Sequence, residues 1–389
     1  MKYKIVSKAE MPQVEELWDY CFEKRQEPFF QYYFGEYCGK ENVVTGAFDD
    51  KGRLQSMMHV NPYRLRVRGC EQLVPYLVGV ATAPEARGAH IVRPLMQATL
   101  AALQAQDVAF VTLMPIFAGI YLPYEFSYCY YRHEYKLPLS ALTLPACSEK
   151  LAVERVPLSA EVLAPIYAHC MEHINGVVLR ADFEWQKLLT VHAQENVLCA
   201  VVRRAGGCVG YMLYNIADGV FNIHELLAED VQAKNRLLRF AATHQSSAQE
   251  LHWLAEPWDK TYLHFTDQSA TGSLAPFMMA RCLKPQLALE QLELADKKLK
   301  GSVIVQITDK LLGDATLRVN VADGRVQATP VKQTADVVLN VGAFTQLYFG
   351  TFSAEELREA GCLQCAEDDK LALLDKLLPK VRTYINEYF

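Results

Sequence analysis

The sequence has 389 residues, of which 51% are apolar and 22% are charged. This length predicts two or three domains, and the composition is that of an ordinary globular protein with an ample core. The net charge of −6 provides no basic surface for nucleic acid and mildly favours cationic substrates.

Two features of the sequence indicate the cellular compartment of the protein. The first seven residues contain no apolar signal-peptide core, and the longest apolar run, residues 108–124, is interrupted by Pro115 and Pro123. That run predicts a buried strand and loop rather than a membrane span. Eleven cysteines, an odd number scattered along the chain, argue for reduced thiols. We therefore expect a cytoplasmic protein.

The first predicted domain, residues 1–140, alternates helices and strands. Ser7-Lys8-Ala9-Glu10 is a capping box, and the helix after it places Leu17 and Trp18 on one apolar face. Strands are expected over residues 43–48, 54–60, 64–67, 74–81 and 110–114, with residues 129–137 closing the domain.

Residues 78–96 carry the strongest local signal. The stretch starts as an apolar strand, breaks at Pro84, passes through Arg87-Gly88 and turns helical, with apolar residues at 92, 95, 96, 100 and 103. A strand that enters a glycine-containing turn at a helix start leaves several backbone N–H groups pointing in one direction. Such a nest binds phosphate, and here it predicts a pyrophosphate site. Pro94 fits the first helical turn, where its missing N–H breaks no intrahelical bond.

The second predicted domain, residues 150–283, repeats this plan weakly. A helix over 160–173 precedes strands over 197–203, 209–216 and 220–227. Where a phosphate-binding turn should follow, the chain has no glycine, and Glu229 and Asp230 would repel a pyrophosphate. We interpret this domain as a catalytically silent copy.

The third predicted domain, residues 284–389, has a different pattern. Alternating apolar residues predict strands near 303–307, 317–321 and 337–341, and helices follow with Phe344, Leu347 and Leu374 on their apolar faces. The pattern predicts a separate α+β domain.

At this point the chain resembles a known family. Glu85-Ala86-Arg87-Gly88-Ala89-His90 is similar to the Gln/Arg-x-x-Gly-x-Gly/Ala run of GNAT-superfamily N-acetyltransferases, although Glu85 and His90 depart from it. The segment 119–126, Gly-Ile-Tyr-Leu-Pro-Tyr-Glu-Phe, resembles the Gly-Ile-Tyr-x-x-Phe-Gly-Phe/Tyr run of the Eis-like ("enhanced intracellular survival") branch. Residues 277–281 also resemble the segment where that family joins its second and third domains, and the chain ends in an aromatic residue, as that family does.

The resemblance implies an α/β (α+β) fold: two tandem GNAT folds with mixed sheets, followed by a sterol-carrier-protein-like α+β domain. It implies acetyl-CoA as the acetyl donor and no metal. The donor would be bound by residues along the strand, the turn, the helix start and the next loop: Val80, Ala81, Thr82, Arg87, Gly88, Ala89, His90, Ile91, Val92, Arg93, Ile116 and Phe117.

The resemblance also assigns the chemistry. Acetyl transfer needs a base for the incoming ammonium and an acid for the departing thiolate. In this family the acid is the tyrosine of the Gly-Ile-Tyr run, here Tyr121, and the base is the terminal carboxylate, here that of Phe389. The acceptor would be an amine of cationic character, such as an aminoglycoside or lysine, and the protein a homo-oligomer, with a hexamer as one candidate.

Other functions stay open at this stage. The chain could be a non-catalytic acyl-CoA-binding or lipid-binding protein with vestigial GNAT domains, although the aliphatic residues of the third domain are explained more simply as core. His169 and His173 form an H-x-x-E-H match, and Cys362 and Cys365 a C-x-x-C match. Neither has further ligands at recognisable spacing, so we expect no metal at either place.

Overall fold

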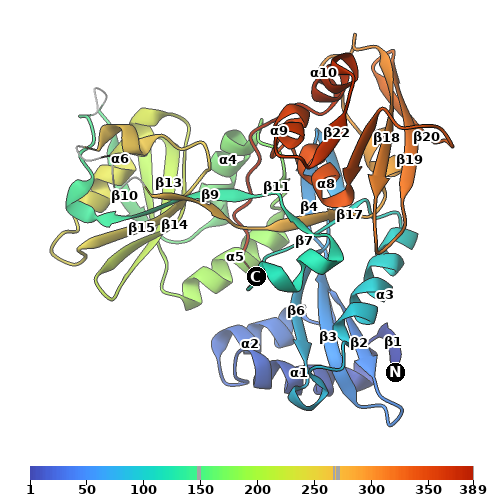
Figure 1. Cartoon of the computed structure of the whole chain (residues 1–389). Coiled ribbons are helices and arrows are strands. Elements are labelled where there is room, and N and C mark those ends of the chain that lie inside the picture. The colour runs from blue at the N-terminus through green and yellow to red at the C-terminus, as the bar shows by residue number, and fades with distance from the viewer. Residues whose placement is uncertain (147–149, 266–267, 269–271, 389) are drawn as a thin grey trace. The chain divides into compact units, whose positions relative to one another are not determined.

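The computed structural model describes residues 1–146, 150–265, 268 and 272–388, which divide into two compact units (Figure 1). The first unit comprises Met1–Tyr130, Asn175–Leu179 and Phe277–Phe389, and the second Tyr131–Ile174 and Arg180–Pro276. None of the helices in the described residues is long and apolar enough to cross a lipid bilayer.

A seven-stranded mixed sheet organises the first unit, in the order β1-β2-β3-β6-β7-β17-β8. Only the pairing of β6 with β7 is parallel, and the other pairs are antiparallel. The strands are β1 (Lys2–Ile5), β2 (Val43–Phe48), β3 (Leu54–Asn61), β6 (Tyr76–Thr82), β7 (Phe110–Leu113), β8 (Ser127–Tyr128) and β17 (Met279–Cys282). A separate small sheet joins β4 (Arg64–Val67), β5 (Cys70–Leu73) and β11 (Val177–Val178).

Helices α1 (Met11–Cys21), α2 (Pro28–Tyr32) and α3 (Val92–Ala105) accompany this sheet. The capping box of Ser7 and Glu10 is present, and Val14, Leu17 and Trp18 are buried, as the sequence pattern predicts. Helix α3 buries Leu95, Met96, Thr99, Leu100 and Leu103 against β3 and β7, which fixes the position of its first turn.

The second unit contains a sheet with the same plan, in the order β10-β12-β13-β14-β15-β9-β16. Its strands are β9 (Tyr131–Pro138), β10 (Ala152–Val156), β12 (Leu198–Arg204), β13 (Gly207–Ala217), β14 (Val220–Ala228), β15 (Glu250–Ala255) and β16 (Ser273–Pro276), and its helices are α4 (Ala160–Met171), α5 (Asp182–Gln194) and α6 (Val231–Ala242). As in the first sheet, the central strand pair, here β14 and β15, is parallel.

The two sheets exchange a strand, which differs from the expected domain order. Residues 129–137 were expected to close the first domain, but β9 pairs with β15 and β16 in the second sheet. The equivalent sixth place of the first sheet is filled by β17, which pairs with β7 and β8. Strand propensity cannot reveal this exchange, because it reports which residues form a strand and not which neighbour the strand pairs with.

The C-terminal residues form a five-stranded sheet in the order β20-β19-β18-β21-β22. It consists of β18 (Gly301–Thr308), β19 (Ala315–Ala322), β20 (Arg325–Pro330), β21 (Val337–Asn340) and β22 (Leu363–Cys365), with helices α7 (Pro285–Glu290), α8 (Val341–Phe349), α9 (Ala354–Glu359) and α10 (Asp368–Leu377). The inward residues of these strands, including Val303, Val305 and Val319, are buried in the hydrophobic core.

This sheet shares its core with the first GNAT sheet. The ring of Phe110 on β7 lies 4.6 Å from that of Tyr348 and 5.3 Å from that of Phe349, both on α8. The buried Arg68 guanidinium donates hydrogen bonds to the carbonyls of Leu347, Tyr348 and Pro379, at 2.6–2.8 Å. It thereby supplies donors to the carbonyls of Leu347 and Tyr348 at the C-terminal end of α8.

Candidate active site

The strand β6 is distorted where it approaches α3. Its register with β3 shifts between Met57 and His59, and Gly79 in this stretch has φ +55°. A Cβ at Gly79 would lie 2.4 Å from the Trp18 ring, so only glycine fits there. The distortion interrupts the ladder next to Val80 and leaves this part of β6 only partly covered.

A cavity of about 310 Å³ follows at the junction of β6 and α3. It is lined by Thr82, Ala86, Arg87, Gly88, His90, Ile91, Val92, Arg93 and Tyr124. Within the described residues, no protein acceptor is found for the backbone N–H groups of Gly88, His90, Ile91, Val92 and Arg93. Unsatisfied N–H groups at a helix start form an anion site, and the positive end of the helix dipole adds to it.

The turn adopts its shape through two left-handed residues. Gly88 has φ +79° with open space beside its α-carbon, and His90 has φ +55°. His90 stands at the place where the GNAT run has Gly or Ala, so a glycine-type conformation is kept while the residue has changed. The side chains of Arg87 and Arg93 are exposed, and Arg87 Nε lies 3.4 Å from the carbonyl of Thr82. Both arginines are placed to attract an anion.

The Gly119–Phe126 segment is next to this site. Ala118–Ile120 and Leu122–Tyr124 form two short 3₁₀ turns, and Tyr121 between them is 8% exposed. Tyr121 belongs to a hydrophobic cluster that Val80 and Val92 also contact. Burial raises the pKa of Tyr121, and Tyr124 raises it further. The phenol is therefore neutral at physiological pH and keeps its proton available.

Tyr124 is a cavity residue that the sequence pattern did not single out. Burial raises its pKa, and the charge of Arg93 lowers it. Glu125, directly after it, is left-handed with φ +61° where the Eis-like run has glycine. Its carboxylate accepts a hydrogen bond of 2.8 Å from the backbone N–H of Lys310, which ties this segment to the loop after β18.

The other expected site residues are not among those that line this cavity. Val80 and Ala81 belong to β6, and Ala89 lies in the turn with its N–H 3.4 Å from the carbonyl of Ala86. Ile116 and Phe117 follow β7 and are 88% and 67% exposed. Two large apolar side chains that project into solvent are suited to contact a bound ligand.

Phe389, the expected base, lies outside the described residues. The chain leading to it, residues 383–387, is buried, and the Tyr388 ring lies 5.2 Å from that of Phe277. Burial raises the pKa of Tyr76, and the charges of Glu387, Tyr388 and Tyr121 raise it further. Glu387 and Tyr388, at the end of the described chain, therefore act on the same residue, Tyr76, as Tyr121 does.

The equivalent helix start in the second unit is already satisfied by protein groups. Asp230 caps α6, and its carboxylate accepts a hydrogen bond of 2.9 Å from the N–H of Ala233 and pairs with Arg204 at 2.6 Å. A carboxylate therefore stands at the place where the first unit offers unsatisfied N–H groups.

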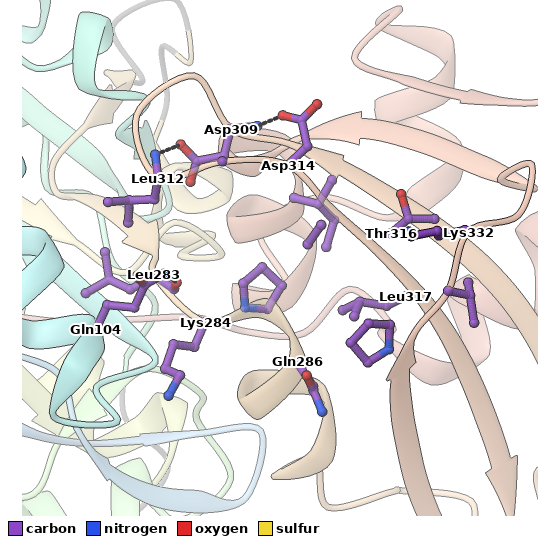
Figure 2. Close-up of a pocket in the computed structure, with 16 residues that line it drawn as sticks. Gln104, Leu283, Lys284, Gln286, Asp309, Leu312, Asp314, Thr316, Leu317 and Lys332 are labelled. Atoms are coloured by element: carbon purple, nitrogen blue, oxygen red, sulfur yellow. Dashed lines mark hydrogen bonds between the residues drawn. The ribbon is translucent and has the colours of Figure 1, made fainter.

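A larger cavity of about 650 Å³ lies elsewhere in the first unit, between the end of α3, α7 and the strands β18 and β19 (Figure 2). Figure 2 shows Leu283 and Leu317 in its wall together with Lys284, Lys332 and Asp309. None of the expected site residues lines it. Its wall combines apolar residues with the charged side chains of Lys284, Lys332 and Asp309.

The family comparisons agree with this architecture. Residues 2–129 and 176–282 each match an acetyltransferase (GNAT) domain family, and residues 285–386 match a sterol carrier protein domain family. No curated protein sequence matches the chain.

Several solved structures match over 100% of this chain. A conserved protein of unknown function from Enterococcus faecalis, described as a probable N-acyltransferase, is 23% identical with a TM-score of 0.88 over 99% of its own length. A GCN5-related N-acetyltransferase from Anabaena variabilis is 18% identical with a TM-score of 0.82, and Eis1 from Mycobacterium abscessus is 18% identical with a TM-score of 0.76, both over 100% of their lengths. At these identities the likeness is one of fold.

The chain therefore belongs to the GNAT acetyltransferases, with two GNAT domains followed by a sterol carrier protein domain. Its fold over the whole length is shared with Eis1, in agreement with the resemblance to the Eis-like branch found in the sequence.

Proposed function

We propose that the protein transfers an acetyl group from acetyl-CoA to a primary amine, with the donor bound in the first GNAT domain. The observation that carries this proposal is the group of five backbone N–H donors around the 310 Å³ cavity at the start of α3, which have no acceptor among the residues that the structure describes. A pyrophosphate supplies the acceptor oxygens that these donors lack, and the exposed side chains of Arg87 and Arg93 add positive charge.

The distorted stretch of β6 would connect this pyrophosphate site to the place where the acetyl thioester reacts. The backbone of Val80, Ala81 and Thr82 would hold the pantetheine arm as an added strand, and Ile116 and Phe117 would cover it from the loop after β7. The amine attacks the thioester carbonyl directly, and the carbon–sulfur bond breaks as the tetrahedral intermediate collapses. Tyr121 then gives its phenolic proton to the departing sulfur.

The proton of the incoming ammonium needs a base. The resemblance assigns that role to the carboxylate of Phe389, and the position of Glu387 and Tyr388 close to Tyr76 supports the proposal. A carboxylate is a weak base in water, but its pKa rises when a closed site removes its solvent. A cationic acceptor such as an aminoglycoside or lysine, a homo-oligomer and a cytoplasmic location are proposed on the same resemblance and on the composition.

We propose a single donor site per chain. The second GNAT domain offers Asp230 at its helix start, where like charges would repel a pyrophosphate.

Calorimetric titration with acetyl-CoA tests this assignment. We expect one site per chain, and a loss of about tenfold or more in affinity for Gly88→Asp, because the new carboxylate faces the pyrophosphate. Gly52→Asp is the matched control: Gly52 also has a left-handed φ of +77° and open space, but it lies in the β2–β3 turn. Two sites per chain, or equal affinity in both variants, would overturn the proposal.

The runner-up function is a non-catalytic acyl-CoA-binding or lipid-binding protein. It predicts acetyl-CoA binding without CoA release over a panel of amines, or a lipid that copurifies with the protein. The tyrosine placed beside the donor seat favours the enzyme over this alternative.

A further inference from the structure

Two histidines and a glutamate converge in the second unit, in a place that the acyl-transfer chemistry does not use. The donor atoms of His192, Glu195 and His224 all lie within 4.8 Å of one another. Nδ1 of His192 lies 3.8 Å from a carboxylate oxygen of Glu195, and the two imidazole rings have centroids 5.6 Å apart. This is the one group of three or more such ligand residues found in the described part of the chain.

The fold holds these residues on two different elements. His192 is in the last turn of α5 and Glu195 is its C-terminal cap, so the two stand three positions apart on one side of the helix. His224 is on β14, where the register with β13 shifts between Leu213 and Tyr214 and leaves His224 without an opposite residue. The shift alters which face each neighbouring side chain takes, and it frees His224 to meet α5.

Buried contacts show which side chains of β14 lie on each face of the second sheet. Phe221, Ile223 and Leu226 of β14 pack in one cluster with Leu237 and Leu238 of α6. Glu225 turns the other way, where it receives Arg180 at 2.8 and 2.9 Å and the hydroxyl of Tyr211 at 2.5 Å. The guanidinium of Arg180 stacks on Tyr167 of α4 and Trp185 of α5, which identifies this as the face that α4 and α5 cover.

The cluster lies at the position in the second sheet that corresponds to the proposed acetyl-CoA site of the first sheet. In both sheets the first strand of the parallel pair carries an irregularity: at Gly79 and Val80 in β6 and at His224 in β14. The first domain uses its irregularity to expose backbone, and glycine is required there. The second domain has the imidazole of His224 at its own irregularity, so the same position in the fold holds a different functional group in the two domains.

The donor set has a definite preference. Two imidazole nitrogens and one carboxylate oxygen bind Zn²⁺ and related first-row divalent ions, and catalytic zinc sites of the His₂Glu type use the same set. Around a tetrahedral ion at about 2.0–2.1 Å the ligand atoms stand about 3.4 Å apart, so the observed separation of 3.8 Å needs only a small side-chain rotation. The C-terminal end of α5 carries partial negative charge, which favours a cation.

The surroundings suit a bound ion that keeps one open side. The side chain of His192 is 12% exposed and that of Glu195 is 55% exposed, so the histidine is held by packing while the carboxylate can move.

We propose that His192, Glu195 and His224 form a binding site for a divalent transition-metal ion of the zinc type, with the fourth position open to water. The proposal does not depend on the acetyl-transfer function, because the site lies wholly within the second unit. It also separates this cluster from His169 and His173, whose sequence motif suggests zinc but whose His173 is 90% exposed and contributes to no such cluster among the described residues.

Zinc titration of the full, untagged and EDTA-treated chain tests the proposal by calorimetry, with Co²⁺ absorption as a second readout. We expect one Zn²⁺ per chain and a cobalt spectrum without thiolate charge transfer. His224→Gln and Glu195→Gln should each reduce zinc affinity by about tenfold or more. Because the side chain of Glu195 is largely exposed, its variant should keep the wild-type melting temperature, so a loss of binding there cannot come from unfolding.

Two double variants serve as controls. His169→Gln with His173→Gln removes the same number of imidazoles, and Cys362→Ser with Cys365→Ser removes the free thiol pair. Both should bind zinc as the wild type does. Absence of zinc binding at micromolar concentrations, unchanged affinity in Glu195→Gln, or loss of the ion in either control would overturn the proposal.

Discussion

Replacement of Tyr121 by phenylalanine isolates the proposed proton donation. The change removes one hydroxyl and keeps the ring, which is 8% exposed and packs 6.3 Å from the Phe126 ring. We therefore expect the free energy of unfolding to change by less than about 1 kcal/mol. General acids contribute about 10²- to 10⁴-fold to a rate, which corresponds to about 2.7–5.4 kcal/mol in the activation free energy. Turnover should fall by that factor, while acetyl-CoA affinity stays within about twofold of wild type, because the seat is built from the backbone of other residues.

The assay is CoA release in single-turnover and steady-state experiments with an amine that the wild type accepts. Tyr124→Phe is the matched control, because Tyr124 lies in the same segment and lines the cavity but has no assigned proton transfer. The pH profile adds a second check: since burial raises the Tyr121 pKa above its usual value of about 10, ionisation of the acid should not reduce turnover below that pH. Near-normal turnover in Tyr121→Phe, with the chemical step shown to be rate-limiting, would refute the reasoning and make Tyr121 a core residue.

Three further outcomes are expected. His90→Gly should raise the free energy of unfolding by up to about 1 kcal/mol in urea melts, because it relieves a left-handed conformation at φ +55°, and calorimetry should show no loss of acetyl-CoA affinity. Arg68→Met should lower the free energy of unfolding by about 3 kcal/mol or more, because three buried carbonyls lose a charged donor, while the exposed Arg64→Met stays within about 0.5 kcal/mol; equal effects would contradict the capping role. One glycine appended after Phe389 would move a terminal carboxylate by up to about 3.6 Å and should nearly abolish turnover without unfolding the protein; full activity would remove that carboxylate from the mechanism.

Local chemistry in the sequence predicted the parts of the fold that depend on neighbouring residues. The capping box at Ser7 and Glu10, the apolar face of α1 and the start of α3 near Val92 follow from short-range patterns, and each is present. The glycine-containing turn before α3 likewise specified where unsatisfied N–H groups would gather. These features are set within a few residues of one another, so a single sequence contains the information.

The pairing of strands that are far apart in the sequence could not be predicted from such short-range patterns. The exchange of β9 and β17 between the sheets places strands beside partners more than a hundred residues away, such as Trp253 opposite Tyr135. Helix α5 was not predicted, and the positions that it buries are Trp185 and Lys187 rather than an aliphatic stripe. The group of His192, Glu195 and His224 was not predicted either, since His192 lies on that helix and His224 becomes its neighbour only through the register shift in β14.

Two residues of the candidate site differ from the sequence motifs of the family, and their backbone conformations show what the structure requires at those positions. His90 and Glu125 both replace positions that are glycine-type in the runs this chain resembles, and both keep a left-handed backbone, at φ +55° and +61°. For an L-residue that conformation costs about 1–2 kcal/mol, so it persists only where the surroundings fix it. At Glu125 the fixing contact is visible, because the carboxylate accepts the backbone N–H of Lys310. His90 lines the cavity and its backbone N–H has no acceptor in the described protein, so a bound anion would supply the missing contact. Backbone geometry, rather than residue identity, is therefore what this chain keeps at the proposed acetyl-CoA site.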